Sequence, residues 1–245
     1  MYTFYNVRGS LAVRMTSRSH QGLVRLNNED RVYCDVDDAF VVLADGMGGL
    51  LAGEVASGVA IDTACQGLRR LDRPHDHADG LADILREAHE AVVGQAKAMG
   101  HIGKMGTTLI IWALRDQHAY FAHVGDSRLY TYTAGDLAQI TVDHTLAQRF
   151  IDEGKYEPDD EENVPNSHVL TQAMGLPGIF AVDTGQVADC ERVLLCSDGL
   201  SDLVSASQIA EIMAMADLDV CADELVGAAL DKGGRDNVTV ALIEF

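Results

Sequence analysis

Four aspartates stand where an apolar run meets a loop, a common position for carboxylates that do chemistry. They are Asp45 after residues 39–44, Asp126 after 120–125, Asp198 after 192–197 and Asp236 before 237–245. Three have a glycine neighbour, in Asp45-Gly46, Gly125-Asp126 and Asp198-Gly199. A strand end holds a carboxylate in place, and glycine lets the backbone carbonyl approach an ion. One Asp-Gly pair is an ordinary turn, but four such aspartates predict a shared site.

If these side chains converge, the site offers only oxygen ligands. Carboxylates and carbonyls suit Mg²⁺ or Mn²⁺, whereas the histidine and cysteine that zinc prefers are absent from these motifs. Two such ions about 3.5–4 Å apart can hold a bridging hydroxide and neutralise a phosphoryl group during in-line displacement. This chemistry also requires an arginine, whose forked guanidinium grips the substrate phosphate.

The elements that must position these residues alternate between strands and helices. Residues 39–44 form a continuous apolar run, which is typical of a strand covered on both faces. Apolar residues then recur at helical spacing over 51–68 and again over 81–92. Four strands follow at 107–114, 119–124, 128–133 and 137–141. Their connections are too short for parallel crossovers, so the strands must pair antiparallel.

The last part of the chain continues the mixture of helices and strands. A short helix is expected over 146–154, followed by an acidic loop at 157–162 and a strand at 192–196. Two helices come next, and Ser205 with Gln208 caps the start of the first. A final strand covers 237–245. Antiparallel strands with helices before, between and after them predict an α+β layered sandwich.

Composition excludes several classes of function. The 245 residues carry 18 basic and 38 acidic side chains, a formal charge of −20. Such a charge repels phosphate backbones and anionic membranes, so neither nucleic acid nor a membrane is an expected partner. The five cysteines contain no Cys-x-x-Cys pair, and the N-terminus has no secretory pattern, which predicts free thiols and a cytoplasmic location.

Six blocks of sequence occur in an order and at separations typical of a known family. They are Arg25-Leu26-Asn27-Asn28-Glu29-Asp30, Asp45-Gly46-Met47-Gly48-Gly49, Gly106-Thr107-Thr108, Gly125-Asp126-Ser127-Arg128, Ser197-Asp198-Gly199 and Asp236-Asn237. Together they resemble the bacterial branch of the metal-dependent protein serine/threonine phosphatases, the PPM or type 2C family. The resemblance extends from about Thr16 to Phe245 and implies a single catalytic domain over 1–245. The implied fold is a four-layer α/β/β/α sandwich with two central antiparallel sheets flanked by helices.

The resemblance also implies a ligand set for two Mn²⁺ or Mg²⁺ ions and a weaker third one. Asp45 would bridge both ions, the Gly46 carbonyl would bind the second, and Asp198 and Asp236 would complete the first. Glu29 would hold waters of the second site. Asp126 and Asp202, together with Asp198, would bind the third ion.

Four further residues have implied roles around these ligands. Arg25 would grip the phosphate, and Asp30, Asn237 and Thr107 would support the ligands. With Arg25, the aspartates Asp45, Asp198 and Asp236 form the expected catalytic set.

The implied reaction is direct attack of a hydroxide shared by two metals on phosphoserine or phosphothreonine in proteins. A cognate Ser/Thr kinase would oppose it, and the enzyme would be a monomer. Met47 stands where mammalian relatives carry a histidine proposed as general acid. A thioether cannot donate a proton, so no side chain is assigned to that role. Residues 146–174 match the family's flap, whose acidic stretch would favour basic phosphopeptides if it contacts substrate.

Three other functions remain open at this point. A catalytically inactive pseudophosphatase would bind phosphoproteins without needing closely spaced carboxylates. A two-metal nuclease or phosphodiesterase would need a basic groove that this composition does not provide. A divalent-ion buffer would need neither Arg25 nor the phosphatase motifs, and the chain has no EF-hand-like loop.

Overall fold

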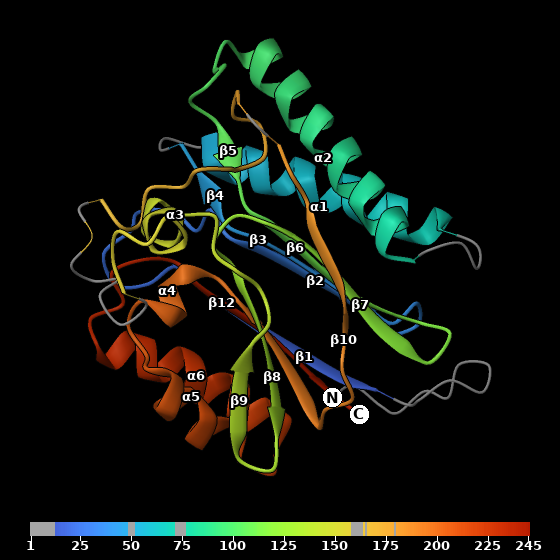
Figure 1. Cartoon of the computed structure of the whole chain (residues 1–245), viewed down its shortest axis with the longest axis vertical. Coiled ribbons are helices and arrows are strands. Elements are labelled where there is room, and N and C mark those ends of the chain that lie inside the picture. The colour runs from blue at the N-terminus through green and yellow to red at the C-terminus, as the bar shows by residue number, and fades with distance from the viewer. Residues whose placement is uncertain (1–12, 49–51, 72–76, 158–163, 165, 179) are drawn as a thin grey trace.

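A computed structural model describes residues 13–48, 52–71, 77–157, 164, 166–178 and 180–245 (Figure 1). Most of the acidic stretch at 157–162 lies outside these residues, as does Gly49. Two five-stranded antiparallel sheets form the centre of the described chain. None of the described helices combines the length and apolar character that a membrane span requires.

The first sheet has the strand order β1-β12-β11-β8-β9. Its strands are β1 (Arg14–His20), β12 (Val238–Glu244), β11 (Arg192–Cys196), β8 (Arg128–Thr133) and β9 (Asp136–Gln139). Helices α4 (Asp198–Ser201), α5 (Ala206–Met213) and α6 (Leu218–Asp231) cover its outer face. The Ser205 hydroxyl accepts a hydrogen bond from the backbone N–H of Gln208, so the predicted cap of α5 is confirmed.

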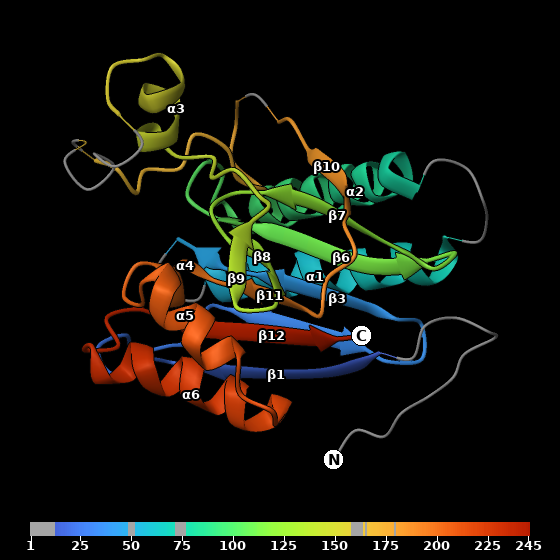
Figure 2. The same ribbon diagram turned by 60° about the horizontal axis from the view of Figure 1, so that its bottom comes forward.

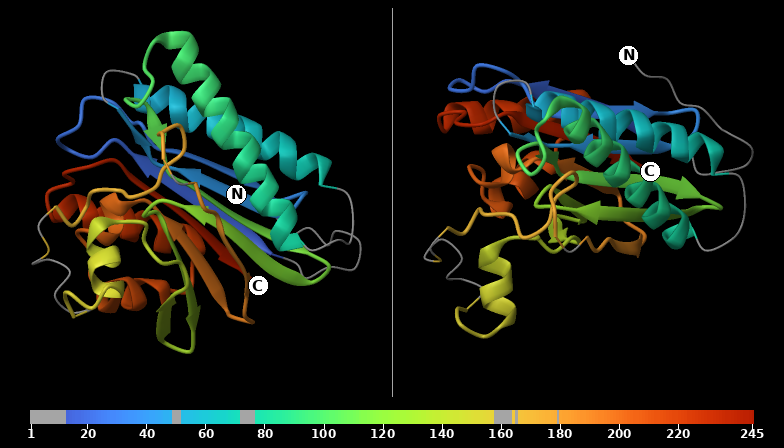
Figure 3. Two further views of the ribbon diagram at one scale, coloured as in Figure 1. Left: turned by 45° about the horizontal axis from the view of Figure 1, so that its top comes forward. Right: turned by 90° about the horizontal axis from the view of Figure 1, so that it is seen from above.

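The second sheet has the order β10-β7-β6-β3-β2. Its strands are β10 (Asp183–Val187), β7 (His118–Val124), β6 (Leu109–Arg115), β3 (Phe40–Ala44) and β2 (Arg31–Asp35). Helices α1 (Ala52–Arg70) and α2 (His77–Met99) pack on its outer face. Helix α3 (Leu146–Asp152) stands away from both sheets, as Figure 2 and the right-hand view of Figure 3 show.

Figure 1 shows the four layers in order, with α1 and α2 above β2, β3 and β6, and with α5 and α6 below β1 and β12. Strand β3 shows why the order of layers follows from the sequence. Phe40, Val42 and Ala44 face α1 and α2, while Val41 and Leu43 face the other sheet, and all five are fully buried. The predicted α+β sandwich, with two central antiparallel sheets flanked by helices, is confirmed.

Three details differ from the sequence expectation. The strand predicted at 107–114 is divided, because β5 (Gly106–Thr107) pairs with β4 (Gly46–Met47) and only β6 continues in the large sheet. The C-terminal part contains a third helix, the one-turn α4. Strands β1, β2 and β10 were not predicted. All three are edge strands, and their exposed sides are polar, so they lack a strong apolar pattern.

Candidate metal centre

Asp45 lies between β3 and β4, and two threonines fix its backbone. The N–H of Asp45 donates to the Thr108 hydroxyl at 2.9 Å. Its carbonyl accepts from the Thr107 hydroxyl at 2.8 Å and from the Thr108 N–H at 2.9 Å. Thr107, for which the resemblance implied a supporting role, therefore contacts Asp45 directly. Thr108 had no predicted role, although it belongs to the same motif.

Close backbone packing explains the glycine after Asp45. A Cβ on Gly46 would lie 2.3 Å from the Gly53 carbonyl oxygen and 2.6 Å from that of Glu29. A Cβ on Gly53, in the first turn of α1, would meet the Glu29 carboxylate at 2.7 Å. Only glycines allow these three segments to meet, and their meeting brings the Glu29 carboxylate to the same cavity as Asp45.

Asn237 joins the two ends of the chain at this site. Its side-chain oxygen accepts from the Glu29 N–H, and its side-chain nitrogen donates to the carbonyls of Gln21 and Asn27, each at 2.8 Å. Its backbone N–H donates to Asp236. One amide side chain thus holds the loop of Arg25 and Glu29 against the strand that follows Asp236.

Asp30 is buried behind the carboxylates that line the cavity. One oxygen accepts from the Ser197 hydroxyl at 2.8 Å, and Ser197 in turn accepts from the Thr239 N–H at 3.0 Å. Burial raises the pKa of Asp30 to about 6, despite the hydrogen bonds from Thr239 and Ser197. Ser197 was not among the predicted site residues, although it stands directly before Asp198 in its motif.

The predicted carboxylates gather around two adjoining cavities. The first, of about 250 Å³, is lined by Arg25, Glu29, Asp45, Gly46, Met47, Gly48, Thr108, Asp126, His168, Leu170, Asp198 and Asp236. Burial raises the pKa values of Asp45 and Asp198 well above their usual range, and the charges of neighbouring aspartates raise them further. These carboxylates therefore cannot all be ionised together without a compensating positive charge.

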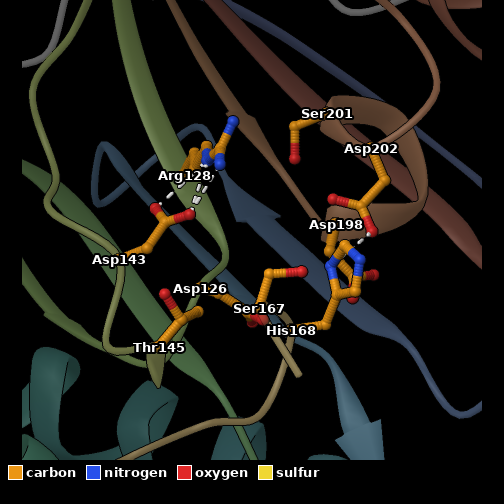
Figure 4. Close-up of a pocket in the computed structure, with 9 residues that line it drawn as sticks. All are labelled: Asp126, Arg128, Asp143, Thr145, Ser167, His168, Asp198, Ser201 and Asp202. Atoms are coloured by element: carbon orange, nitrogen blue, oxygen red, sulfur yellow. Dashed lines mark hydrogen bonds and ion pairs between the residues drawn. The ribbon is translucent and has the colours of Figure 1, made fainter. Parts of the chain in front are cut away.

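The second cavity, of about 280 Å³, shares Asp126, Asp198 and His168 with the first. Figure 4 shows Asp202 on one side and the Arg128–Asp143 ion pair on the other. Burial, and then the charge of Asp143, raises the pKa of Asp126 to about 7. The structure thus gathers Asp126, Asp198 and Asp202 around one space, as the resemblance implied.

Among the described residues, Arg25 is the one arginine or lysine that lines the first cavity. Its Nη2 donates to Asp236 Oδ2 at 2.5 Å, and its side chain is about half exposed. Burial by itself would lower the pKa of Arg25, but the hydrogen bond and charge of Asp236 raise it. The guanidinium is therefore oriented by a carboxylate and still accessible to an anion entering the cavity.

The donor set fits a hard divalent cation. One oxygen each of Asp30 and Asp198 is buried without a hydrogen-bond partner in the described parts of the chain. Leaving such atoms unpaired is costly, and a cation would relieve both this cost and the repulsion between carboxylates. The carboxylates and the Gly46 carbonyl offer only oxygens and outnumber His168 and Met47, the other donors that line the first cavity, which favours Mn²⁺ or Mg²⁺ over zinc.

We expect Mn²⁺ to stabilise the protein more at pH 8 than at pH 5. The folded-state pKa values of Asp30 and Asp126, about 6 and about 7, exceed the ordinary 3.8. The folded metal-free protein therefore binds protons more tightly than the unfolded chain, and these groups lower its stability as pH rises from about 4 to about 7. At low pH, protons compete with the metal.

The measurement is a thermal melt with EDTA or Mn²⁺ at each pH. At pH 8, Mn²⁺ at 100 times its Kd should raise the melting temperature by about 5–10 °C for each site filled. A gain of the same size at pH 5 and pH 8 would contradict a link between these raised pKa values and metal binding at the site.

Comparison with known proteins agrees with this geometry. A family model described as protein phosphatase 2C matches residues 16–231. The serine/threonine protein phosphatase PstP of Mycobacterium tuberculosis is 37% identical over 241 residues, which cover 97% of this chain and 46% of PstP. The chain therefore spans about half the length of that relative. The serine/threonine phosphatase Stp of Listeria monocytogenes is 34% identical over 236 residues, covering 93% of this chain and 94% of Stp.

A solved structure gives the same result. The crystal structure of the catalytic domain of PstP in complex with two manganese ions superposes with a TM-score of 0.82 at 36% identity. The superposition covers 95% of this chain and 97% of that one. A family match over most of the chain, relatives above 30% identity and a shared fold lead to one conclusion. The chain belongs to the protein phosphatase 2C family of metal-dependent phosphatases.

Proposed function

We propose that the protein hydrolyses phosphoserine and phosphothreonine in proteins, using two Mn²⁺ or Mg²⁺ ions. The observation that carries this proposal is the first cavity, where Asp45, Asp198 and Asp236 share one space with the accessible guanidinium of Arg25. The carboxylates suit metal ions, and the arginine suits the phosphate that those ions would face. Relatives that are named serine/threonine phosphatases support this choice of substrate.

Each residue has a defined part in this proposal. Asp45, the Gly46 carbonyl, Asp198 and Asp236 would hold two ions, with Glu29 beside them. Bound there, the ions would supply an activated water and neutralise charge on the phosphoryl group. Thr107, Asn237 and Asp30 keep the ligands in place through the contacts described above. A weaker ion would bind among Asp126, Asp198 and Asp202, in the second cavity.

Arg25 binds two phosphate oxygens and orients the phosphorus atom toward the carboxylates that would hold the ions. Its bond to Asp236 restricts the guanidinium before substrate arrives, which reduces the entropy lost on binding. Met47 lines the same cavity, and its thioether has no proton to donate. The leaving serine or threonine oxygen therefore takes its proton from a source other than residue 47.

We extend the proposal to the organisation of the chain. Residues 1–245 would form a single catalytic domain, and 146–174 would be a flap that contacts substrate. His168 and Leu170 belong to this segment and line the cavity of Asp45, which supports that role. The enzyme would act as a cytoplasmic monomer, and a Ser/Thr kinase would supply its phosphoprotein substrates.

The decisive experiment measures phosphate release from a phosphothreonine peptide, in EDTA and across a Mn²⁺ titration. A phosphotyrosine peptide and bis-p-nitrophenyl phosphate serve as matched substrates for other phosphoesterases. We expect hydrolysis of the phosphothreonine peptide that requires Mn²⁺, with slower turnover of the other two. Preference for the diester would favour a phosphodiesterase. Binding of the phosphopeptide without any hydrolysis would favour a pseudophosphatase.

A further inference from the structure

His144 contacts the residue directly before Asp126 in two ways. The backbone N–H of His144 donates to the Gly125 carbonyl at 2.9 Å. The N–H of Gly125 donates to Nδ1 of the His144 ring at 3.1 Å. His144 thus binds both the N–H and the carbonyl of Gly125. These two bonds fix the orientation of the peptide backbone directly before Asp126.

Gly125 is confined on its other side as well. Its φ is +115°, and a Cβ there would lie 2.6 Å from the Thr108 side chain. The Thr108 hydroxyl is 2.8 Å from the Ser127 hydroxyl and also accepts from the Asp45 N–H. The turn that carries Asp126 is therefore held between the backbone of Asp45 and the ring of His144.

The other side of His144 contacts the far end of the 146–174 segment and the strand beyond it. Its carbonyl accepts from the Thr171 N–H at 2.8 Å, and its Nε2 lies 3.1 Å from Asp183 Oδ2. Asp183 is the first residue of β10. Because Nδ1 accepts from Gly125, the proton of the neutral ring is on Nε2 and is donated to Asp183. His144 thus joins both ends of the segment that carries α3 in Figure 2.

This hydrogen-bond pattern argues against a separate metal site formed by His144 and its neighbours. Ligand atoms of His123, His144 and Asp183 lie within 4.8 Å of one another. A metal on Nε2 of His144 would have to displace the proton donated to Asp183, and the ring would then lose its bond from Gly125. His123 is fully buried, with a pKa lowered to about 3 by burial and by His144, so its neutral ring packs beneath His144.

We propose that His144, oriented by Asp183, is a positioning residue that couples the 146–174 segment to Asp126. The contacts of His144 with Thr171 and Asp183 then set the affinity of the Asp126, Asp198 and Asp202 group for a divalent cation. The inference rests on the proposed function in treating these carboxylates as the weaker metal site. It goes beyond that function in naming the contacts that hold the turn of Asp126 from outside the two cavities.

The test is calorimetric titration of Mn²⁺ into the metal-free protein and into two variants of Asp183. Asp183→Ala removes the acceptor for Nε2–H, whereas Asp183→Asn keeps an oxygen in the same place. We expect Asp183→Ala to weaken the lower-affinity Mn²⁺ sites about 10-fold and to leave the tighter sites unchanged. Asp183→Asn should bind Mn²⁺ nearly as the wild type does. Asp183 is exposed, so both variants should fold.

Two further variants separate positioning from a general structural effect. Thr184→Ala alters the exposed neighbour on β10 and should leave Mn²⁺ binding unchanged. His144→Asn keeps an acceptor near the Nδ1 position but loses the bond to Asp183, so it should behave as Asp183→Ala does. Unchanged Mn²⁺ binding in Asp183→Ala, an equal loss in Thr184→Ala, or a wild type without lower-affinity sites would overturn the coupling. Because the readout is ion binding, failure of hydrolysis is a separate result that bears on the proposed function.

Discussion

Replacing Asp198 with asparagine should lower turnover of a phosphothreonine peptide by at least about 100-fold at saturating Mn²⁺. Asp198 lines both cavities, and one of its oxygens has no hydrogen-bond partner among the described residues. Asparagine keeps the shape of the side chain but removes the negative charge that a shared metal ligand supplies. The measurement is steady-state hydrolysis across a Mn²⁺ titration. Near-normal turnover in the variant would refute the role of Asp198 as a ligand.

The same substitution should stabilise the metal-free protein at pH 8. Burial and the charges of Asp126, Asp202 and Asp236 raise the pKa of Asp198, so its ionised form destabilises the fold. A neutral amide removes this repulsion. We expect the melting temperature in EDTA to rise by about 2–4 °C, equivalent to about 1 kcal/mol, while the gain from Mn²⁺ shrinks.

A matched control distinguishes this effect from a general loss of negative charge. Asp136→Asn changes an exposed aspartate on β9 and should leave both turnover and the Mn²⁺ response unchanged. We expect Asp198→Asn to lose activity and gain metal-free stability, and Asp136→Asn to change neither. This result would identify Asp198 as a carboxylate that is retained for ion binding at the expense of stability.

Replacing Arg25 with alanine should raise KM for phosphopeptides about 10-fold or more, with a smaller effect on kcat. This pattern is expected because the guanidinium is accessible and already oriented by Asp236, so it can bind phosphate before the chemical step. Arg25→Lys should fall between alanine and the wild type, since lysine keeps the charge but cannot form two parallel hydrogen bonds. The measurement is the dependence of initial rate on peptide concentration at saturating Mn²⁺.

Arg31 provides the control for Arg25. It is also partly exposed and pairs with Glu54 at 2.6 Å, but it does not line the cavity. Arg31→Ala should leave KM unchanged. If Arg25→Ala lowers only the melting temperature and KM stays the same, Arg25 has a structural role, and the phosphate must be bound elsewhere.

The carboxylates of the site could be predicted because their signals are local. Asp45, Asp126, Asp198 and Asp236 each follow or precede an apolar run, and Gly46 and Gly199 mark places where backbone segments touch. A Cβ on Gly199 would lie 1.9 Å from the Asn237 carbonyl oxygen, for example. The buried strand β3 and the long helices could be predicted for the same reason. A continuous apolar run marks the strand, and apolar residues at helical spacing mark the helices.

Three of the four edge strands and several polar supports could not be predicted in this way. Strands β1, β2 and β10 have one open edge, so their residues alternate weakly and their pairing is decided by the neighbouring strand. Thr108, Ser197 and His144 are ordinary polar residues until a partner far along the chain approaches them. Hydrogen-bonding side chains of this kind have no characteristic period, and only packing selects their partners.

Residue types and short motifs were enough to predict oxygen ligands and a hard divalent metal, and they identified the family that the comparisons confirm. The tertiary structure decided which groups act together. It brings Arg25 to Asp236, 211 residues away, and it places Asn237 between Glu29 and Asp236. It also joins Asp183 through His144 to the turn of Asp126. Such contacts depend on sheet order and layer packing, which bring distant segments to one end of the sandwich.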